Sequence, residues 1–392
     1  MNNISIISDL VCTGCTSCLQ ACPKSCISLK NGENGFLYPT VNEKECIQCK
    51  KCLKVCPAHN EFEAREPLKC FVASNIDDNI RLKSSSGGVF IELAKYVISH
   101  QGIVYGAIFD KEWNVHHVSA SIIEEVYPMM GSKYVQSNIG NTFIEVKKYL
   151  NNGREVLYTG TPCQIAGLYR FLGKNYPNLL TMDFSCHGVP SNYIWHKYLN
   201  EAISKNGVHS ISEILFRDKS ISWDKFCFVV KGTYSNSESP QNIIYDIHYN
   251  NPYMKGFLND LYLRKSCYNC PSKSQKSHSD ITIGDYWGVV KQGCMQEDHK
   301  KGISLLLINT EKAKTVFNII TDRLNIEEIS YADAIKSNEN LLKPTHCPFS
   351  KVRKFNKLIA NNTLIASIEK TLKKNVVQKK WISLLYKLGI KK

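Results

Sequence analysis

The most constraining feature of the sequence is a run of four cysteines that occurs twice, each time closed by a proline. The first run reads CTGCTSCLQACP (residues 12–23) and the second reads CIQCKKCLKVCP (residues 46–57). The spacing C-x2-C-x2-C-x3-C-P places three thiolates on one short loop, where they bind three irons of a 4Fe-4S cluster, and sends the fourth to a second cluster. Two crossed ligand sets are therefore expected: Cys12, Cys15, Cys18 with Cys56, and Cys46, Cys49, Cys52 with Cys22.

Other features of this segment agree with a small metal-binding domain. Pro23 and Pro57 follow the fourth cysteines and end the short helices that carry them, because proline lacks an N–H donor and has a fixed φ. Residues 27–45 contain two Asn-Gly pairs and an alternating pattern, which favours a β-hairpin. Zinc is the alternative metal, but zinc sites usually show two C-x2-C pairs separated by a longer loop. Cys26 lies outside the repeated spacing and is interpreted as a small buried residue.

The cysteine content also bears on the cell compartment, since the chain has 17 cysteines in 392 residues. The N-terminus lacks the basic region, apolar run and cleavage site of a secretion signal, and no stretch reaches the ~18 apolar residues of a membrane span. A cytoplasmic location is therefore expected, where thiols stay reduced and metal binding is the expected use of many cysteines. The length allows two or three domains, at roughly 100–200 residues each.

The net charge of +14 is concentrated at the C-terminus. Residues 351–392 contain twelve Lys or Arg and one acid, Glu369, a balance of +11 that leaves only +3 for the first 350 residues. An almost neutral body argues against nucleic-acid binding, which requires a basic face on a folded module.

The end of this basic tail has an apolar pattern of helical period. Within residues 376–392 the apolar side chains recur at i, i+4, i+7, i+8 and i+11, so we expect a basic amphipathic helix. Two interpretations remain open: peripheral contact with an anionic membrane at its inner face, and docking of the apolar face on the protein's own body. The apolar residues are Val377, Trp381, Leu384, Leu385 and Leu388.

Between these ends, predicted strands and helices alternate. After a polar linker at about residues 58–68, the strand CFVASN leads to a Ser- and Gly-rich loop that runs into an amphipathic helix. Such a loop offers hydroxyls, N–H groups and the positive helix dipole to a phosphate, although an ordinary helix cap is the commoner use of this pattern. The segment GSKYVQSNIG places a lysine among small polar residues. The candidate cofactor-binding residues are Ser84, Ser85, Ser86, Gly87, Gly88 and Lys133.

Four further cysteines are candidate ligands of a third metal site. Cys163 follows the strand EVLYTG and Cys186 follows the strand LLTMDFS, and chemistry in α/β sheets gathers at the carboxyl ends of strands. RKSCYNCPSKS supplies Cys267 and Cys270 as a C-x2-C pair. A zinc site, or two buried thiols with an unrelated pair, are the alternatives. No G-x-G-x-x-G or phosphate-loop motif is present, which argues against a standard dinucleotide-binding fold or an NTPase.

Taken in order, the two-cluster segment and the motifs SSSGGVF, GSKYVQS, YTGTPCQIAGL, FSCHGVPS, SCYNCPSKS and ITIGDYWG resemble the beta-subunit family of coenzyme F420-reducing hydrogenases and dehydrogenases. The resemblance covers residues 1 to about 350. It implies a flavin (FAD) enzyme with an additional 4Fe-4S cluster beside the flavin, held by Cys163, Cys186, Cys267 and Cys270. It also places the loop Ser84 to Gly88 and the Lys133 segment around the flavin.

The fold class expected is an α+β ferredoxin-like dicluster domain followed by an α/β flavin-binding domain. We divide the chain into the dicluster domain (1–60), two parts of the flavin oxidoreductase domain (61–150 and 151–350) and the basic tail (351–392). Iron–sulfur clusters carry single electrons and a flavin carries two, so the predicted function is an oxidoreductase that joins a ferredoxin-type protein to an organic substrate. Activity like that of coenzyme F420 dehydrogenases, or a role in polysaccharide biosynthesis, fits the resemblance. The alternatives are an electron-transfer subunit without a substrate site, and a structural zinc module.

Overall fold

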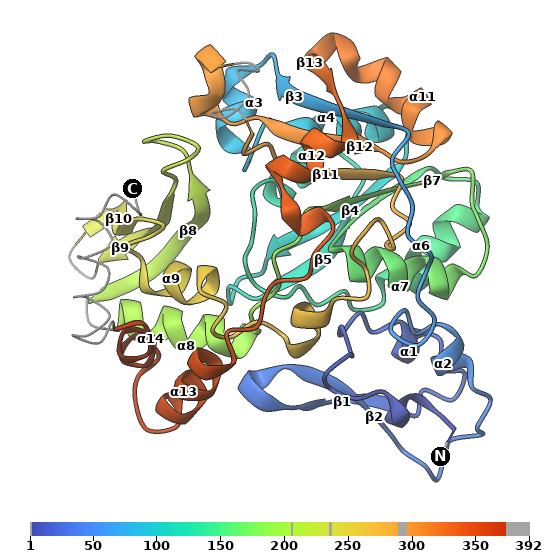
Figure 1. Cartoon of the computed structure of the whole chain (residues 1–392), viewed down its shortest axis with the longest axis horizontal. Coiled ribbons are helices and arrows are strands. Elements are labelled where there is room, and N and C mark those ends of the chain that lie inside the picture. Colours follow the sequence, from blue (N-terminus) through green and yellow to red (C-terminus); the bar gives the residue numbers. More distant parts are fainter. Residues whose placement is uncertain (1, 205–206, 235–236, 289–295, 374–392) are drawn as a thin grey trace.

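The computed structural model describes residues 2–204, 207–234, 237–288 and 296–373, so the predicted tail helix at 376–392 lies outside the described residues. Within these residues the strands form a two-stranded hairpin, an eight-stranded central sheet and a three-stranded sheet (Figure 1). The predicted order of a small cysteine-rich segment followed by an α/β body is confirmed.

The cysteine-rich segment contains the hairpin, 3-10 turns at Ile4–Ile6 and Glu33–Gly35, and two one-turn helices. β1 (Ile27–Asn31) pairs antiparallel with β2 (Leu37–Val41), as the Asn-Gly pairs predicted. The helices α1 (Ser17–Gln20) and α2 (Lys51–Lys54) each begin after a residue in the left-handed conformation, Thr16 with φ of 56° and Lys50 with φ of 61°. The two halves of the sequence repeat therefore adopt the same local backbone.

The central sheet is mixed, in the order β13-β3-β12-β11-β7-β6-β4-β5. The pairs β4–β6, β6–β7 and β7–β11 are parallel, whereas the pairs towards both edges are antiparallel. β3 lies between β12 and β13, so residues before and after position 150 build one sheet. The strands are β3 (Lys69–Asn75), β4 (Ile103–Phe109), β5 (Val115–Ala120), β6 (Val156–Thr159), β7 (Leu179–Phe184), β11 (Ile281–Asp285), β12 (Ser304–Ile308) and β13 (Leu324–Ile329).

Helices cover both faces of this sheet, because successive side chains of a strand point to opposite faces. Leu157 of β6 packs in the core that includes α4 and α11, whereas its neighbour Tyr158 packs in the core that includes α6 and α7. The predicted helix after the Ser-Gly loop is confirmed as α4. The helices around the sheet are α3 (Asp78–Lys83), α4 (Val89–Ser99), α5 (Ile123–Val126), α6 (Thr142–Asn151), α7 (Pro162–Leu172), α11 (Glu311–Ile320) and α12 (Tyr331–Ser337).

The three-stranded sheet has its own core. Its antiparallel strands pack with α8, α9, α13 and α14 around a dense aromatic cluster that includes Trp195, Phe228 and Tyr253. The tip of the N-terminal hairpin lies against this part, since Asn34 Nδ2 donates to Asn356 Oδ1 of α13 at 3.2 Å. The elements are β8 (Val208–Asp218), β9 (Cys227–Tyr234), β10 (Ser237–Ile247), α8 (Asn192–Ile203), α9 (Pro252–Leu258), α13 (Phe349–Ile359) and α14 (Leu364–Leu372).

Candidate metal centres and the neighbouring polar cluster

The first crossed cysteine set lines one cavity, which we call the inner site. Cys12, Cys15 and Cys18 come from the loop before α1 and from α1 itself, and Cys56 comes from the other half of the repeat. The space they line measures about 370 Å³, part of it open to solvent. Burial raises the pKa of Cys18, and the nearby thiols of Cys15, Cys12 and Cys56 raise it further. The structure therefore brings these four sulfurs together.

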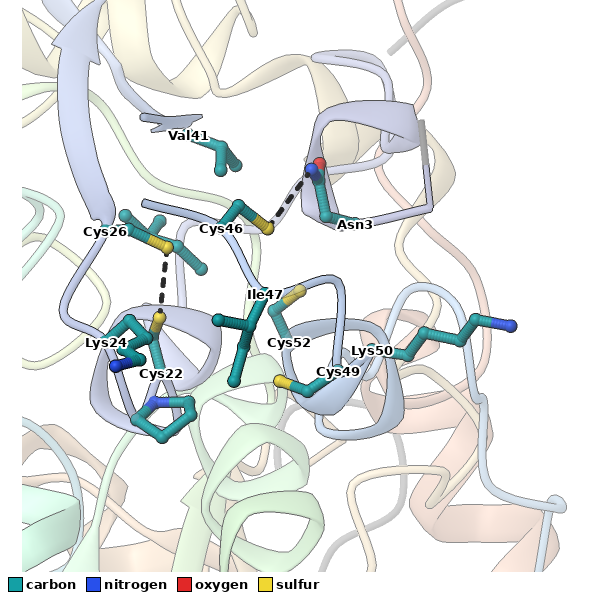
Figure 2. Close-up of a pocket in the computed structure, with 12 residues that line it drawn as sticks. Asn3, Cys22, Lys24, Cys26, Val41, Cys46, Ile47, Cys49, Lys50 and Cys52 are labelled. Atoms are coloured by element: carbon teal, nitrogen blue, oxygen red, sulfur yellow. Dashed lines mark hydrogen bonds between the residues drawn. The ribbon is translucent and has the colours of Figure 1, made fainter. Parts of the chain in front are cut away.

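The second crossed set lines a cavity of about 340 Å³, which we call the outer site (Figure 2). Asn3 Nδ2 donates to the Cys46 sulfur at 3.7 Å, and Cys49 is exposed to solvent. Cys26 is buried, as expected, but it also lines this cavity, with its sulfur 3.5 Å from that of Cys22. The cysteines that line the outer site are Cys22, Cys26, Cys46, Cys49 and Cys52.

Zinc and a 4Fe-4S cluster make different demands on four cysteines. The four ligands of one zinc ion surround a single point at ≈ 2.3 Å, so their sulfurs lie about 3.8 Å apart, whereas the thiolates of a 4Fe-4S cluster bind separate irons and spread more widely. Among the described residues, no group of three or more His, Cys, Asp or Glu side chains is arranged to hold a single metal ion. Four cysteines around one cavity of this size fit the cluster that the repeated spacing predicts.

The third candidate quartet comes from three separate places in the sequence. Cys163 lies in the first turn of α7, Cys186 follows β7, and Cys267 and Cys270 lie in and after a 3-10 helix (Lys265–Asn269). Burial raises the pKa of Cys163 well above its usual value, and the thiols of the other three raise it further. All four cysteines are thus neighbours, although they are drawn from residues 163–270.

A buried lysine lies beside this quartet. Lys273 Nζ donates to the carbonyl oxygens of Cys186, at 2.5 Å, and of Asn340, at 2.6 Å. Burial raises the pKa of the Cys186 thiol to about 11, and the Lys273 charge works in the opposite direction. A fixed positive charge here favours thiolates. The sequence analysis did not single out Lys273, although its position three residues after Cys270 was an available signal.

Helix α7 joins the third quartet to the inner site. A Cβ placed on Gly167 of α7 would lie 2.6 Å from Ser17 Oγ and 3.0 Å from the Cys15 sulfur. Gly167 follows Cys163 by four residues, about 6 Å along the helix axis. The contact surface of α7 therefore connects the neighbourhood of Cys163 directly to Cys15, a predicted ligand of the inner site.

The two segments predicted to surround a cofactor are adjacent. The Ser132 N–H donates to Ser85 Oγ at 2.6 Å. Other polar groups there are engaged by the protein itself: Ser84 and Ser86 donate to the carbonyl oxygens of Ile80 and Ile303. Lys133 Nζ donates to the carbonyl oxygens of Met130 and Gly131, at 3.1 and 3.2 Å, and burial lowers its pKa to about 7. The structure thus groups the six predicted residues but leaves few of their polar atoms unpartnered.

Sequence analysis missed a second polar group close to these segments. Arg217, at the end of β8, pairs through Nη1 with Asp285, while its Nε and Nη2 have no hydrogen-bond partner within the described residues. Trp223 donates to the same carboxylate at 2.9 Å, and Trp287 stacks on Trp223 with ring centroids 4.6 Å apart. Tyr134 lies close enough to Arg217 and Ser132 to interact with both. The motif ITIGDYWG contained two of these residues, and that was the available signal.

Comparisons with known proteins agree with the two parts of the chain. The 4Fe-4S dicluster domain matches residues 11–60, and the C-terminal region of the coenzyme F420 hydrogenase/dehydrogenase beta subunit matches residues 153–333. A chain of the F420-reducing [NiFe] hydrogenase complex from Methanosarcina barkeri is 16% identical with a TM-score of 0.46, over 76% of this chain and 95% of that one. No curated protein matches the sequence significantly. The chain thus contains a region similar to the C-terminal part of the coenzyme F420 hydrogenase/dehydrogenase beta subunit, at residues 153–333, and a 4Fe-4S dicluster domain at residues 11–60.

Proposed function

We propose that this protein is an iron–sulfur flavoprotein oxidoreductase that transfers electrons between a ferredoxin-type protein and an organic substrate. The observation that carries the proposal is the gathering of Cys163, Cys186, Cys267 and Cys270 at one end of α7, one helical turn from the contact with Cys15. Four thiols beside a buried lysine fit a third 4Fe-4S cluster, because they supply a full ligand set and a compensating positive charge.

The Nε and Nη2 atoms of Arg217 support the proposal that a flavin binds near the third quartet. Nε and Nη2 of this buried guanidinium carry three N–H groups that meet no acceptor at hydrogen-bond geometry among the described residues, although the Tyr134 hydroxyl lies nearby, and an unsatisfied buried donor costs about 1–3 kcal/mol. A flavin offers carbonyl, ring-nitrogen and phosphate acceptors. The stacked pair of Trp223 and Trp287 would add a flat apolar surface beside it, with Trp287 42% exposed.

When bound, the clusters exchange single electrons and the flavin exchanges two, which couples a one-electron carrier to a two-electron reaction. The protein's part is to hold these groups close together. Cys15 and Cys18 of the inner site are buried, whereas Cys49 of the outer site is exposed and its neighbour Ile47 is 57% exposed. A ferredoxin-type partner would therefore approach at the outer site.

No helix among the described residues is long and apolar enough to cross a membrane. Peripheral membrane contact through residues 376–392 stays a prediction, and sedimentation with anionic vesicles at low and high salt tests it. The described residues offer no feature that favours a role in polysaccharide biosynthesis, so the proposal does not include one.

Anaerobic purification of the full chain, followed by iron, sulfide and flavin analysis, tests the proposal. Three clusters require about twelve irons and about twelve acid-labile sulfides per chain, together with one flavin. About eight irons without flavin would reduce the protein to a two-cluster electron carrier. Zinc in place of iron would leave only the structural alternative. Reduction of the bound flavin by a reduced ferredoxin, measured by absorbance, separates a complete electron path from unconnected sites.

A further inference from the structure

Arg264 connects the dicluster segment to the α/β body. Its guanidinium reaches into the N-terminal segment, where Nε donates to the Cys12 carbonyl oxygen at 2.7 Å and Nη2 donates to the Leu37 carbonyl oxygen at 2.8 Å. Nη1 donates to Gln136 Oε1 at 3.0 Å. Nη2 also lies 3.7 Å from the Cys12 sulfur, within range of an N–H···S hydrogen bond. The side chain is 1% exposed.

The main chain of Arg264 contacts the segment that carries two cysteines of the third quartet. Arg264 immediately precedes the 3-10 helix that carries Cys267, and the Cys267 N–H donates to the Arg264 carbonyl oxygen at 2.8 Å. One residue thus touches a ligand of the inner site through its side chain and a ligand of the third quartet through its backbone.

No carboxylate forms an ion pair with Arg264 in the described part of the chain. Its guanidinium lies instead over the ring of Tyr38, 4.4 Å from the centroid, and a Cβ on Gly14 would come within 2.8 Å of its Cζ. A buried cation needs a compensating negative charge, because its desolvation is costly. Cys12, whose sulfur lies 3.7 Å from Nη2, would supply this charge as a thiolate together with the cluster that it would hold.

Among the described residues, no buried cation donates to a sulfur of the outer site. The side chain that donates to one of its sulfurs, Asn3, is neutral, and Asn3 also donates to the Glu43 carboxylate at 3.0 Å. The cations that line the outer cavity, Lys24 and Lys50, are exposed, so solvent and salt screen their charges. The two sites, similar in ligands and in local backbone, differ in buried charge.

We propose that Arg264 is a redox-tuning residue that raises the reduction potential of the inner-site cluster above that of the outer-site cluster. A buried positive charge and a hydrogen bond to a ligand sulfur both favour the more negative, reduced state. An electron shared between the two clusters then resides mainly at the inner site, next to α7 and the third quartet. This inference rests on the proposed function, since it gives the dicluster segment a direction of electron flow.

The test is a redox titration of the full-length protein, monitored by electron paramagnetic resonance. Cys49→Ser, which alters a ligand of the outer site only, identifies which signal belongs to which cluster. In the wild type, the inner signal is expected to appear first as the potential is lowered. Arg264→Gln is expected to reduce the ratio of reduced to oxidised inner cluster about tenfold at a fixed potential, which is a shift of ~59 mV for one electron. The paired control Lys24→Gln/Lys50→Gln is expected to leave both signals within about a twofold change in that ratio, because exposed charges are screened.

Two results would overturn the inference. One is an outer signal that titrates at the higher potential in the wild type, which needs no variant at Arg264 and so does not depend on whether Arg264→Gln folds. The other is an Arg264→Gln protein with full iron content and an unchanged inner potential. Failure of the proposed function would appear differently, as missing clusters or missing flavin in the wild-type protein.

Discussion

In the dicluster segment, residues 12–18 supply three of the four cysteines that line one cavity, whereas the third quartet gathers its thiols from the ends of β6 and β7 and from the loop before β11. The first arrangement depends on loop spacing and one crossing from the other half of the repeat. The second depends on the parallel order of β6, β7 and β11 in the central sheet. The sites of the dicluster segment should therefore tolerate a change that destabilises the central sheet. The third quartet should not, because the sheet holds its cysteines together.

The largest expected effect comes from removing one ligand of the third quartet. Cys186→Ser should lower the iron content by about four per chain and abolish electron transfer from a reduced ferredoxin to the flavin, because a cluster that loses a thiolate ligand is destabilised. Iron analysis and resonance spectra of the anaerobically purified protein measure this. The matched control is Cys227→Ser, a buried cysteine of β9 that belongs to none of the three sets. Equal iron loss in both variants would count against the third quartet.

Replacing Cys22, which is predicted to complete the ligand set of the other half of the repeat, should damage only one of the two N-terminal clusters. Because the Cys26 sulfur lies 3.5 Å from that of Cys22 and could replace it, we combine Cys22→Ser with Cys26→Ser. The double variant should lose the outer cluster, about four irons, and keep the inner one. Resonance spectra that show the inner signal lost instead would contradict the crossed ligand sets, since Cys22 is nearer in sequence to Cys12, Cys15 and Cys18.

Acid should weaken the sheet-dependent region through His117 of β5. Its Nδ1 lies 2.6 Å from Ser137 Oγ and its Nε2 lies 2.8 Å from the Thr159 carbonyl oxygen, at the turn that leads to Cys163. Burial lowers the pKa of His117 to about 4. Between about pH 6.5 and 4, His117 is protonated in the unfolded chain but neutral in the folded chain. As the pH is lowered through this range, the free energy of unfolding therefore decreases, by at most about 3 kcal/mol.

Urea unfolding of the wild type and of His117→Gln across this pH range measures the effect as a difference between the two proteins. The variant should lose this part of the pH dependence, whereas the control His100→Gln, at an exposed position, should keep it. Parallel curves for the wild type and His117→Gln would mean that His117 is not the titrating group.

The smallest expected effect concerns the junction between the two regions. Gly167→Ala gains about 1 kcal/mol of helix propensity but places a methyl group 2.6 Å from Ser17 Oγ. Overpacking costs typically 1–3 kcal/mol, so we expect a net loss of about 1 kcal/mol and slower reduction of the flavin by the dicluster segment. Thermal unfolding and stopped-flow absorbance provide the two measurements. Adding Ser17→Ala removes the closest contact and should restore most of the stability; if it does not, the junction is not where the strain lies.

Much of the dicluster segment was accessible from the sequence. The repeated spacing predicted which cysteines would meet, and the Asn-Gly pairs predicted the hairpin of β1 and β2. The hairpin prediction is confirmed because its interactions are local, with positive φ at Asn34 and Gly35 defining the turn. The ligand sets stay a prediction, which rests on a C-x2-C-x2-C loop too short to present its sulfurs in many ways. The strand-end positions of Cys163 and Cys186 were likewise visible, because each follows directly on an apolar strand.

The charged side chains around these sites were decided by the tertiary structure alone. Arg264 lies far in sequence from Cys12, and Arg217 lies far from Asp285, so no spacing rule connects them. Both arginines are buried. Each meets its partner only because the hairpin, the central sheet and the three-stranded sheet pack against one another. Ligand spacing is a property of a few consecutive bonds, and it can be read along the chain. The charge around a ligand depends on which surfaces of the chain are buried against each other. Hydrophobic burial is non-directional, so the sequence does not indicate which distant residues it will bring together.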